Sequence, residues 1–252
     1  MDLIPARGFV LGAIAYAESD KIVQLFTAQL GRVKAIVKGA RKPKSKLASA
    51  IDLFTESSFS LHKRAKSELY LLAQAKVVDA HPDLKADFHT ITALQVLAEL
   101  LTQFLPDSEP HTDVYLLLKQ TLGALTGPKG DRELILTAFS VKLLELLGYP
   151  FEIGQCVECG ASLQRQSAGL VPHRGGALCK DCGPSRNGRL SITPAGMEIL
   201  KKLKTLPMDK VHVLKLRPDV TRGLFLTVLE YLEVTLEKKL KMLDYYRKVF
   251  PG

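Results

Sequence analysis

The pattern of hydrophobic and polar residues changes near residue 80 of this 252-residue chain. Before that point, apolar stretches are separated by turn or polar residues, as short β-strands are. The pattern predicts five strands, at Phe9–Tyr16, Ile22–Ala28, Arg32–Lys38, Ser58–His62 and Leu69–Val78. Between the third and fourth strands, Leu47–Ile51 is long enough for a turn or two of helix. This arrangement fits an OB-type Greek-key barrel over residues 1–80, and periodicity alone leaves another five-stranded barrel as the alternative.

Two of these strands show a difference between their faces. On the third strand, period-two alternation separates basic from apolar side chains. The basic face holds Arg32, Lys34 and Lys38, and the apolar face holds Val33, Ala35 and Val37. On the fifth strand, the pattern predicts one face lined by Leu69, Leu71, Ala73, Ala75 and Val77, with Tyr70, Gln74 and Lys76 opposite.

After residue 84, apolar residues recur at helical spacing. The first three helical stretches indicated in this way are Ile91–Phe104, Val114–Leu125 and Leu134–Leu146. Asp131 is placed to cap the third of them, and Thr193 followed by Pro194 is placed to begin a short helix. We expect Asp219 to cap the last and longest helix, whose apolar stripe reaches Leu243.

The chain has four cysteines, in two Cys-x2-Cys pairs separated by nineteen residues: Cys156 with Cys159, and Cys179 with Cys182. Two pairs at this spacing are typical of a tetrahedral zinc site to which each pair supplies two thiolates. We therefore predict one structural zinc ion per chain, bound by these four residues. Two disulfides or four free thiols are the alternatives.

The residues around the cysteines agree with a closed zinc site. Gly160 and Gly183 follow the two pairs, and glycine tolerates the positive φ with which a knuckle turns backbone N–H groups toward sulfur. His173 lies between the pairs and is an alternative ligand, but four suitably spaced thiols favour its being a solvated connector residue. Four thiolates leave no open coordination position, so the site holds a fold and does not activate water.

The predicted fold class is therefore α+β multidomain. It comprises an OB-type barrel over residues 1–80 and an α-helical domain over residues 81–252, with a zinc module inserted at about residues 153–188.

Charge is distributed unevenly along the chain, whose formal net charge is +9 and whose pI is about 9.3. Residues 1–79 carry 13 basic and 7 acidic side chains, residues 80–155 carry 5 and 10, and residues 156–252 carry 17 and 9. A basic balance favours a polyanionic partner, and the acidic middle indicates that different faces meet different partners.

The chain has no apolar run that approaches the length of a membrane span. The apolar stretch Phe9–Ala17 ends in Ala-Tyr-Ala, like a signal-peptide cleavage site, but it is short and continues into strand-like sequence. Zinc binding through thiols also favours a reducing compartment. We expect a cytoplasmic, nucleoid-associated protein.

No motif in the sequence supports catalysis. Gly31 and Gly39 flank a predicted strand without the Gly-Lys-Ser/Thr of a phosphate-binding loop, and the six histidines are scattered over residues 62–212. Acidic residues of the middle segment fall where helix caps and exposed faces are expected. We therefore predict that the protein is not an enzyme.

Basic residues of the predicted barrel are the better functional candidates. They come from the third strand, the lysine-rich loop after it, and the turn between the fourth and fifth strands. The predicted DNA-binding residues are Arg32, Lys34, Lys38, Arg41, Lys42, Lys44, Lys46, Lys63, Arg64 and Lys66. In an OB barrel, a charged face and its flanking loops follow a phosphate backbone. One such run alone would be a solvated loop; three on one domain favour nucleic-acid binding.

Aromatic residues of the predicted strands are a weaker signal. Tyr16 and Tyr70 are candidate platforms for base stacking, or else ordinary packing residues.

Three longer stretches carry a further signal. They are Ser19–Lys46, which contains Lys-Gly-Ala-Arg-Lys-Pro-Lys-Ser-Lys, then Ser67–Val78, and Lys142–Pro150, which leads into the first cysteine pair. Together they resemble the RecO family of bacterial recombination and repair proteins, and the resemblance extends over nearly the whole chain. The lysine-rich run is its most specific part. The resemblance implies an N-terminal OB domain, a helical domain and a zinc element.

The resemblance also implies a function, that of a non-enzymatic recombination mediator in DNA repair. Proteins of this family bind single- and double-stranded DNA, anneal complementary strands and act with RecR. Together they help the recombinase RecA onto strands covered by single-strand-binding protein, whose C-terminal tail is a further implied partner. Some members lack the cysteines, which makes zinc structural.

Two other functional classes remain as alternatives. One is a protein-interaction adaptor of a repair complex with little direct DNA binding, in which the acidic helical region binds proteins. The other, a zinc-dependent nucleic-acid enzyme, needs an open metal site and a general base, and the sequence offers neither.

Overall fold

The computed structural model describes residues 3–64, 67–126, 131–149, 151–164, 167–183 and 190–249. The chain divides into two compact units, which are described separately below. The first comprises Met1–Leu94 and Leu100–Leu116, and the second comprises Gln95–Glu99 and Leu117–Gly252.

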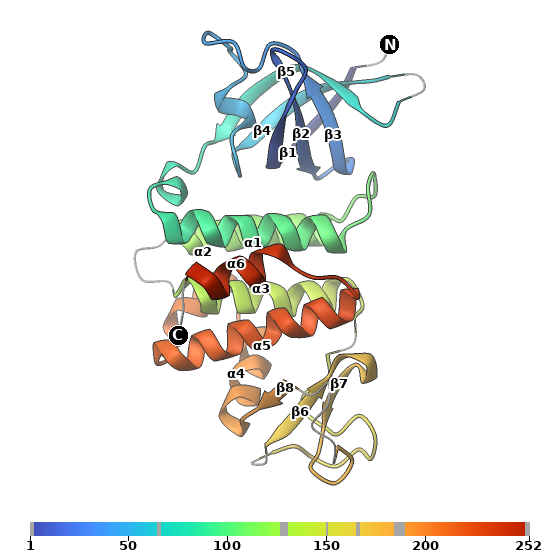
Figure 1. The fold of residues 1–252 in the computed structure, drawn as a ribbon, viewed down its shortest axis with the longest axis vertical. Coiled ribbons are helices and arrows are strands. Elements are labelled where there is room, and N and C mark those ends of the chain that lie inside the picture. The colour runs from blue at the N-terminus through green and yellow to red at the C-terminus, as the bar shows by residue number, and fades with distance from the viewer. Residues whose placement is uncertain are drawn as a thin grey trace. The chain divides into compact units, whose positions relative to one another are not determined.

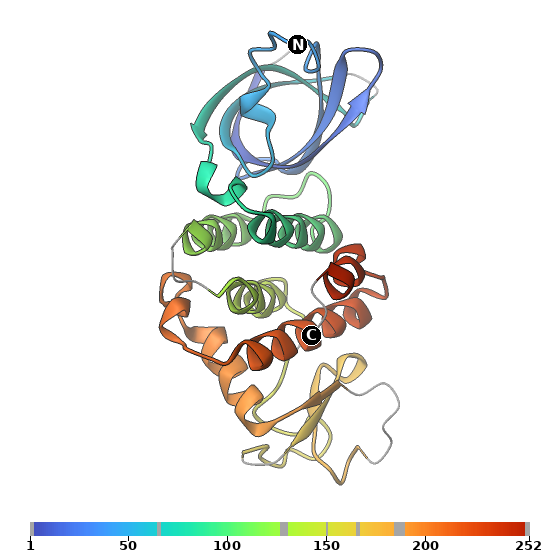
Figure 2. The ribbon, with the colours of Figure 1, turned by 60° about the vertical axis from the view of Figure 1, so that its left-hand side comes forward.

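The first unit contains a closed five-stranded barrel, seen in Figure 1 and, turned by 60°, in Figure 2. Its strands are β1 (Leu3–Tyr16), β2 (Asp20–Thr27), β3 (Gly31–Val37), β4 (Glu56–Lys63) and β5 (Tyr70–Asp79), with a short 3-10 helix, η1 (Ser49–Ile51), between β3 and β4. The order is β1-β2-β3-β5-β4, in which β3 and β5 pair in parallel and the other neighbours are antiparallel. This is the OB topology, and all five predicted strands are confirmed.

The predicted faces of the third strand are confirmed on β3. Val33, Ala35 and Val37 are buried in the barrel core, whereas Lys34 on the opposite face is exposed. One residue of the outer face was not part of the predicted pattern. Ile36 lies between the lysines and is only 3% exposed, so its neighbours cover it.

The predicted faces of the fifth strand are wrong, because β5 contains a bulge. Ser60 pairs with Gln74, but the next residue of β4, Leu61, pairs with Leu72, so Ala73 has no partner. An extra residue reverses the side to which the following side chains point. Tyr70 and Leu72 therefore enter the core before the bulge, and Ala75 packs against the core after it.

A buried carboxylate connects the barrel to the start of the second long helix within this unit. Glu56 on β4 is 2% exposed and accepts hydrogen bonds from Arg7 Nε at 2.8 Å and from the hydroxyl of Tyr115 at 2.9 Å. Burial, followed by the hydrogen bond to Glu56, raises the pKa of Tyr115 far above its usual value. A buried charge with two donors is stable, but loss of either donor leaves it poorly compensated.

The α-helices begin close to where the sequence predicts. They are α1 (Phe88–Phe104), α2 (Thr112–Thr126), α3 (Arg132–Leu146), α4 (Pro194–Thr205), α5 (Pro218–Leu236) and α6 (Lys241–Val249), with 3-10 helices at Pro82–Lys85 (η2), Pro172–Arg174 (η3) and Met208–Val213 (η4). Asp131 caps α3 by accepting from the N–H of Leu134 at 3.2 Å, and Thr193 caps α4 by accepting from Gly196 at 3.1 Å. Within the second unit, α3 packs against α4 and α5.

The C-terminal region differs from the prediction of a single long helix capped by Asp219. Because Pro218 takes the first helical position, α5 starts earlier, and Asp219 lies in its first turn, paired with Arg217 at 2.8 Å. The helix then stops at Glu237, whose φ of 52° is left-handed.

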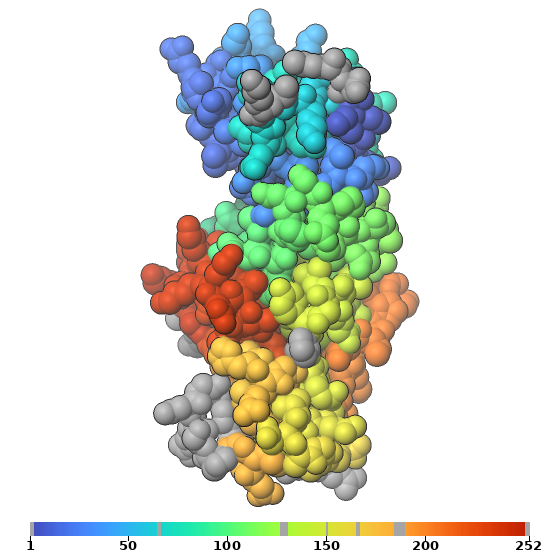
Figure 3. Space-filling view, turned by 90° about the vertical axis from the view of Figure 1, so that its right-hand side faces the viewer, coloured from blue at the N-terminus to red at the C-terminus, as the bar shows by residue number. Residues whose placement is uncertain are grey.

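The chain forms a new helix, α6, immediately after this break. The backbone N–H groups of Lys241 and Met242 each donate to the carboxylate of Glu99 at 2.8 Å. Figure 3 shows the C-terminal segment that contains α6, coloured red, at the molecular surface. Carboxylates at a helix N-terminus satisfy its free N–H groups, so Glu99 allows the helix to restart there.

Among the described residues, no helix is long and apolar enough to cross a membrane.

A glycine at the start of β3 gives a test of barrel packing. Gly31 has a φ of +64°, and a Cβ there would overlap the backbone of Glu109 in the same unit. We expect Gly31→Ala to lower the free energy of unfolding by about 2 kcal/mol or more, because both the left-handed backbone and the contact oppose a side chain. Urea denaturation measures the loss.

The matched control is Gly12→Ala on β1, where an added Cβ meets nothing within 4 Å. This variant should unfold within about 0.5 kcal/mol of the parent. Equal stability of the two variants would contradict the close approach at Gly31.

Candidate metal centre and basic barrel surface

The four cysteines lie in a small β-module of the second unit. It contains a three-stranded sheet, β6 (Ala168–Val171), β7 (Gly176–Leu178) and β8 (Leu190–Ile192), in the order β7-β6-β8. Cys179 directly follows β7, and the turn that carries the first pair is held to β7 by a hydrogen bond from Val157 N–H to the Ala177 carbonyl at 3.0 Å. The fold therefore brings the second pair beside the first. Within the expected module, residues 165–166 and 184–188 lie outside the described part of the chain.

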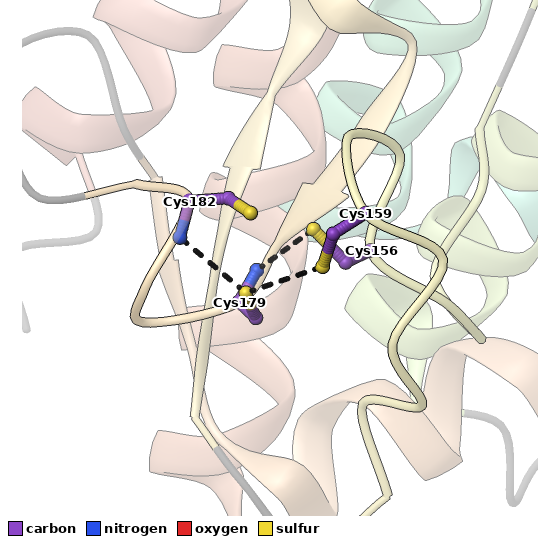
Figure 4. Close-up of side chains that lie close together, drawn as sticks. All are labelled: Cys156, Cys159, Cys179 and Cys182. Carbon is purple, nitrogen blue, oxygen red and sulfur yellow. Dashed lines mark hydrogen bonds between the residues drawn. The ribbon is translucent and has the colours of Figure 1, made fainter.

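All four sulfur atoms lie within 4.8 Å of one another, and Figure 4 shows the side chains converging from two turns. The Sγ atoms of Cys159 and Cys179 are 3.8 Å apart. A tetrahedral site with metal–sulfur bonds of about 2.3 Å has sulfur–sulfur edges of about 3.8 Å. All four thiols are free of disulfides in the structure. The cluster therefore has the geometry and donor set of a metal centre.

Backbone groups support the two knuckles in the same way. The N–H of Gly160 donates to the Cys156 carbonyl at 2.9 Å, and the N–H of Gly183 donates to the Cys179 carbonyl at 3.2 Å. Gly160 has the expected positive φ, of 72°. Backbone N–H groups of Cys179 and Cys182 also point at Sγ atoms, each at 3.4 Å, and such bonds stabilise thiolates.

The pKa values of two of the thiols, those of Cys156 and Cys182, are shifted in opposite directions. Burial of Cys156 opposes ionisation of its thiol, but backbone N–H donors, that of Cys179 foremost, lower its pKa to about 6. Hydrogen bonds with the thiols of Cys159 and Cys179 raise the pKa of Cys182 far above its usual value. A cation among the sulfurs changes this balance, because it favours the thiolate at every ligand.

His173 is not part of this cluster. It is exposed in the η3 connector, as expected of a solvated residue, and the group of described residues able to hold a metal consists of the four cysteines alone.

The lysine-rich loop after β3 presents its four basic side chains to solvent. Arg41, Lys42, Lys44 and Lys46 are all exposed. A shallow hollow of about 460 Å³ on this loop is lined by Lys38, Gly39, Lys42, Lys44, Ser45, Lys46 and Leu47. The hollow's lining therefore includes four lysines and no acidic side chain, a composition that suits an anionic group.

Arg41 has a second role, in holding the loop to the β1–β2 turn. Its backbone N–H donates to the Ser19 carbonyl at 2.9 Å, and its guanidinium donates to the carbonyls of Ala17 and Glu18 at 3.4 and 3.2 Å. The three lysines of the loop are thus better suited to test charge than Arg41 is.

The candidate DNA-binding residues on β3, Arg32 and Lys34, make contacts with other residues of the first unit. Arg32 donates to the Thr102 carbonyl at 2.6 Å and pairs with Asp107 at 2.7 Å, and its side chain is only 14% exposed. Lys34 lies 3.7 Å from the same carboxylate. Arg32 therefore has a structural role. The ammonium of Lys34 lies near the Asp107 carboxylate but remains exposed.

Lys38 is paired too, but more openly. Its ammonium lies 2.8 Å from Asp20, whose other oxygen accepts from the Gly39 N–H at 2.9 Å. The hydrogen bond from Lys38, foremost, lowers the pKa of Asp20. This carboxylate fixes the point where β3 enters the loop, and Lys38 itself remains largely exposed.

The turn between β4 and β5 is only partly described. Lys63 and Arg64 are exposed, whereas Lys66 lies outside the described residues. Lys63 and Lys34 line a hollow of about 620 Å³ that also contains Glu68 and Asp107. Its charge is mixed, so this second basic element is less suited to phosphate than the loop hollow is.

The two tyrosines behave differently. Tyr70 is buried in the barrel core, so it is a packing residue. Tyr16, at the end of β1, is 44% exposed and remains available to a ligand.

Sequence reasoning did not foresee the two carboxylates that pair with the candidate cations. Asp20 is close to Lys38 in space only because β2 pairs with β3, and Asp107 reaches Arg32 from the loop after α1. No local period connects such residues, and the only hint in the sequence was that Asp20 lies two residues before the predicted strand Ile22–Ala28.

The fold and sites define an OB-barrel protein with a helical region and a four-cysteine candidate metal centre. The family model "Recombination protein O N terminal" matches residues 1–81, and "Recombination protein O C terminal" matches residues 85–244. The chain belongs to the Recombination protein O family, as the sequence resemblance predicts.

Similar proteins with the name "DNA repair protein RecO" cover nearly the same length. That of Desulforamulus reducens is 29% identical over 250 residues, which are 99% of this chain and 96% of the relative. That of Pelotomaculum thermopropionicum is 32% identical over 244 residues, 96% of this chain and 92% of the relative. That of Clostridium acetobutylicum is 30% identical over 244 residues, 97% of each.

The cysteine cluster leads to a direct test. We expect purified protein to carry one metal ion per chain and Cys182→Ser to lose most of it, since three thiolates bind more weakly than four. Native mass spectrometry and elemental analysis measure the content. Hydrogen exchange should then rise first in the β-module, while barrel strands stay protected.

His173→Ala is the matched control, because this residue lies in the connector without joining the cluster. It should retain the metal. Protein that contains no metal and carries disulfides between these cysteines would contradict the assignment.

Proposed function

We propose that this protein is a non-enzymatic, DNA-binding recombination mediator in DNA repair. The observation that carries the proposal is the loop hollow of four lysines, on a barrel whose fold commonly binds nucleic acid. The family and the names of the relatives support the same role.

The basic loop, together with Lys34 on β3 and Lys38 directly after it, contacts the phosphate backbone of single- and double-stranded DNA. Phosphate contacts fix the position of a strand and carry no base information. Binding is therefore indifferent to sequence, which annealing of any two complementary strands requires. Lys63, Arg64 and Lys66 are secondary contacts, and Arg32 positions the strand that carries Lys34.

The metal in the four-cysteine centre is zinc, with a structural role. Cys156, Cys159, Cys179 and Cys182 are a thiolate donor set, which suits zinc among the common divalent ions. When bound, zinc cross-links the two turns that carry the cysteine pairs and takes no part in catalysis. The backbone N–H groups aimed at the sulfurs then hold the thiolates in position.

The family resemblance supports the protein partners of this proposal. RecR and the C-terminal tail of single-strand-binding protein dock on the chain, and the recombinase RecA is affected indirectly. An acidic tail with an apolar end requires a basic rim beside an apolar pocket. The protein acts in the cytoplasm, in association with the nucleoid.

One observation favours the adaptor as a second candidate. Three basic residues of the proposed surface, Arg32, Lys34 and Lys38, already have carboxylate partners. If the loop were neutralised by a protein partner as well, direct DNA binding would be weak.

Salt-dependent binding separates the two candidates. We expect the triple variant Lys42→Ala, Lys44→Ala, Lys46→Ala to bind a single-stranded oligonucleotide more weakly and to anneal strands more slowly. Each lost phosphate contact should flatten the slope of log affinity against log salt by about 0.7, or by about 2 for all three. Fluorescence anisotropy at several salt concentrations measures the slope.

The matched control replaces three exposed lysines of the second unit, Lys202, Lys210 and Lys239, by alanine. It changes net charge equally and should leave the slope near that of the parent. If the loop variant is folded by circular dichroism yet binds and anneals as the parent does, the DNA site lies elsewhere.

The tail of single-strand-binding protein gives a second test. A peptide of its acidic C-terminus should bind this protein in calorimetry at low salt and more weakly at high salt, because charge attraction contributes. A peptide lacking the terminal apolar residues should lose binding. Absence of heat from the full peptide at low salt would remove this partner from the proposal.

A further inference from the structure

The four cysteines of the candidate metal centre differ in their exposure to solvent. Cys156 and Cys179 are 2% and 3% exposed, whereas Cys182 is half-buried and Cys159 is exposed. The whole turn around Cys159, residues 158–162, is exposed as well. A Cβ added at Gly160, the next residue, would meet nothing in the described structure within 4 Å. Small solutes therefore reach Cys159 more readily than the other three cysteines.

Backbone hydrogen bonds distinguish the sulfurs in the same way. Each buried sulfur accepts an N–H at 3.4 Å, that of Cys156 from Cys179 and that of Cys179 from Cys182. Within the described part of the chain, no backbone N–H donates to the sulfur of Cys159. Because an N–H donor stabilises the charge of a thiolate, it also lowers the nucleophilicity of the sulfur. The Cys159 thiolate thus combines access with reactivity.

A second sulfur lies beside Cys159 on the other turn. Figure 4 marks the contact between the Sγ atoms of Cys159 and Cys179, which are 3.8 Å apart. A disulfide bond is about 2.05 Å long, so a movement of about 2 Å brings these sulfurs to bonding distance. An accessible thiolate next to another cysteine is the arrangement found at oxidation-sensitive sites.

We propose that Cys159 is an oxidation site for hydrogen peroxide, with Cys179 as the cysteine that resolves it, and that this oxidation releases the metal. The inference rests on the metal centre of the proposed function and is independent of the DNA surface. Residues 1–80 contain no cysteine, so thiol oxidation is confined to the β-module.

The reaction has two steps. The Cys159 thiolate bonds to one oxygen of hydrogen peroxide and the O–O bond breaks, which gives a sulfenic acid and a hydroxide that solvent protonates. The Cys179 thiolate then bonds to the Cys159 sulfur, and a second hydroxide leaves and is protonated. The sulfurs lose two electrons in total, and peroxide is reduced to two molecules of water. The metal keeps two thiolates and dissociates, because its four-thiolate site is lost.

Tryptic mapping of the parent protein identifies the bond that forms. Cleavage places Cys159 in the peptide 143–165, Cys179 in 175–180 and Cys182 in 181–186. After zinc-loaded protein is treated with limiting peroxide, we expect the first peptide to be cross-linked to the second, with fragmentation placing the bond at Cys159. Dimedone, which traps sulfenic acids, should label Cys159. A different pair of cysteines as the main product overturns the inference.

Cys159→His and Cys182→His are a matched pair of variants. Each leaves three thiolates and one imidazole, a donor set that structural zinc sites also use. With peroxide, Cys159→His should release zinc to a chromophoric chelator about tenfold more slowly than the parent, because its most accessible thiolate is gone. Cys182→His should stay close to the parent. Release to the chelator without peroxide controls for altered affinity, and equal peroxide-dependent rates for the two variants overturn the inference.

Failure of the metal centre is a separate result. Parent protein that carries no metal before peroxide is added refutes the centre and, with it, this inference. Metal-loaded protein that keeps its metal in peroxide overturns the oxidation site alone. Neither result bears on the DNA surface, which the triple lysine variant tests.

Discussion

Closure of the barrel is the constraint on which the functional surfaces depend. Because β1 pairs with both β2 and β4, and β3 with β5, no strand edge of the barrel remains open. Every strand side chain must then face either the core or the outside. Lys34 of β3 lies on the outer surface because Val33, Ala35 and Val37, at the alternate positions, fill the inside.

Carboxylates hold the elements around this barrel in place. Glu56 binds β1 and Tyr115, Asp20 fixes the start of the lysine-rich loop, and Asp107 binds Arg32. These pairs differ in what they do to nearby cations. Asp107 takes Arg32 out of the exposed surface, whereas Asp20 orders the loop through the Gly39 N–H and leaves Lys38 largely exposed. The basic loop therefore has a fixed base and free lysine ends.

Local patterns in the sequence predict the secondary-structure elements. They do not predict bulges, helix breaks or ion pairs, which depend on residues far away in the chain. The five strands, the caps Asp131 and Thr193 and the two cysteine pairs each follow from residues a few positions apart. The bulge at Ala73 does not, because a bulge is defined by the pairing of β4 with β5. The break after α5 likewise depends on Glu99, which lies far back in the chain and accepts the first N–H groups of α6. The same holds for the candidate DNA-binding residues, because only the fold shows that Arg32 pairs with Asp107.

The proposed DNA surface combines two contacts whose strengths respond to different conditions. Lysine–phosphate attraction weakens steeply with salt, whereas stacking of a base on an exposed ring depends far less on salt. Stacking on an aromatic side chain is worth about 1–3 kcal/mol per base. Only Tyr16 offers an exposed ring at this surface among the residues described, because Tyr70 is in the core. Under the proposed function, we expect a strand at this surface to be held mainly by its charge, without preference for sequence. Such weak, charge-dependent binding agrees with the proposed annealing of complementary strands, which requires that each strand can also be released.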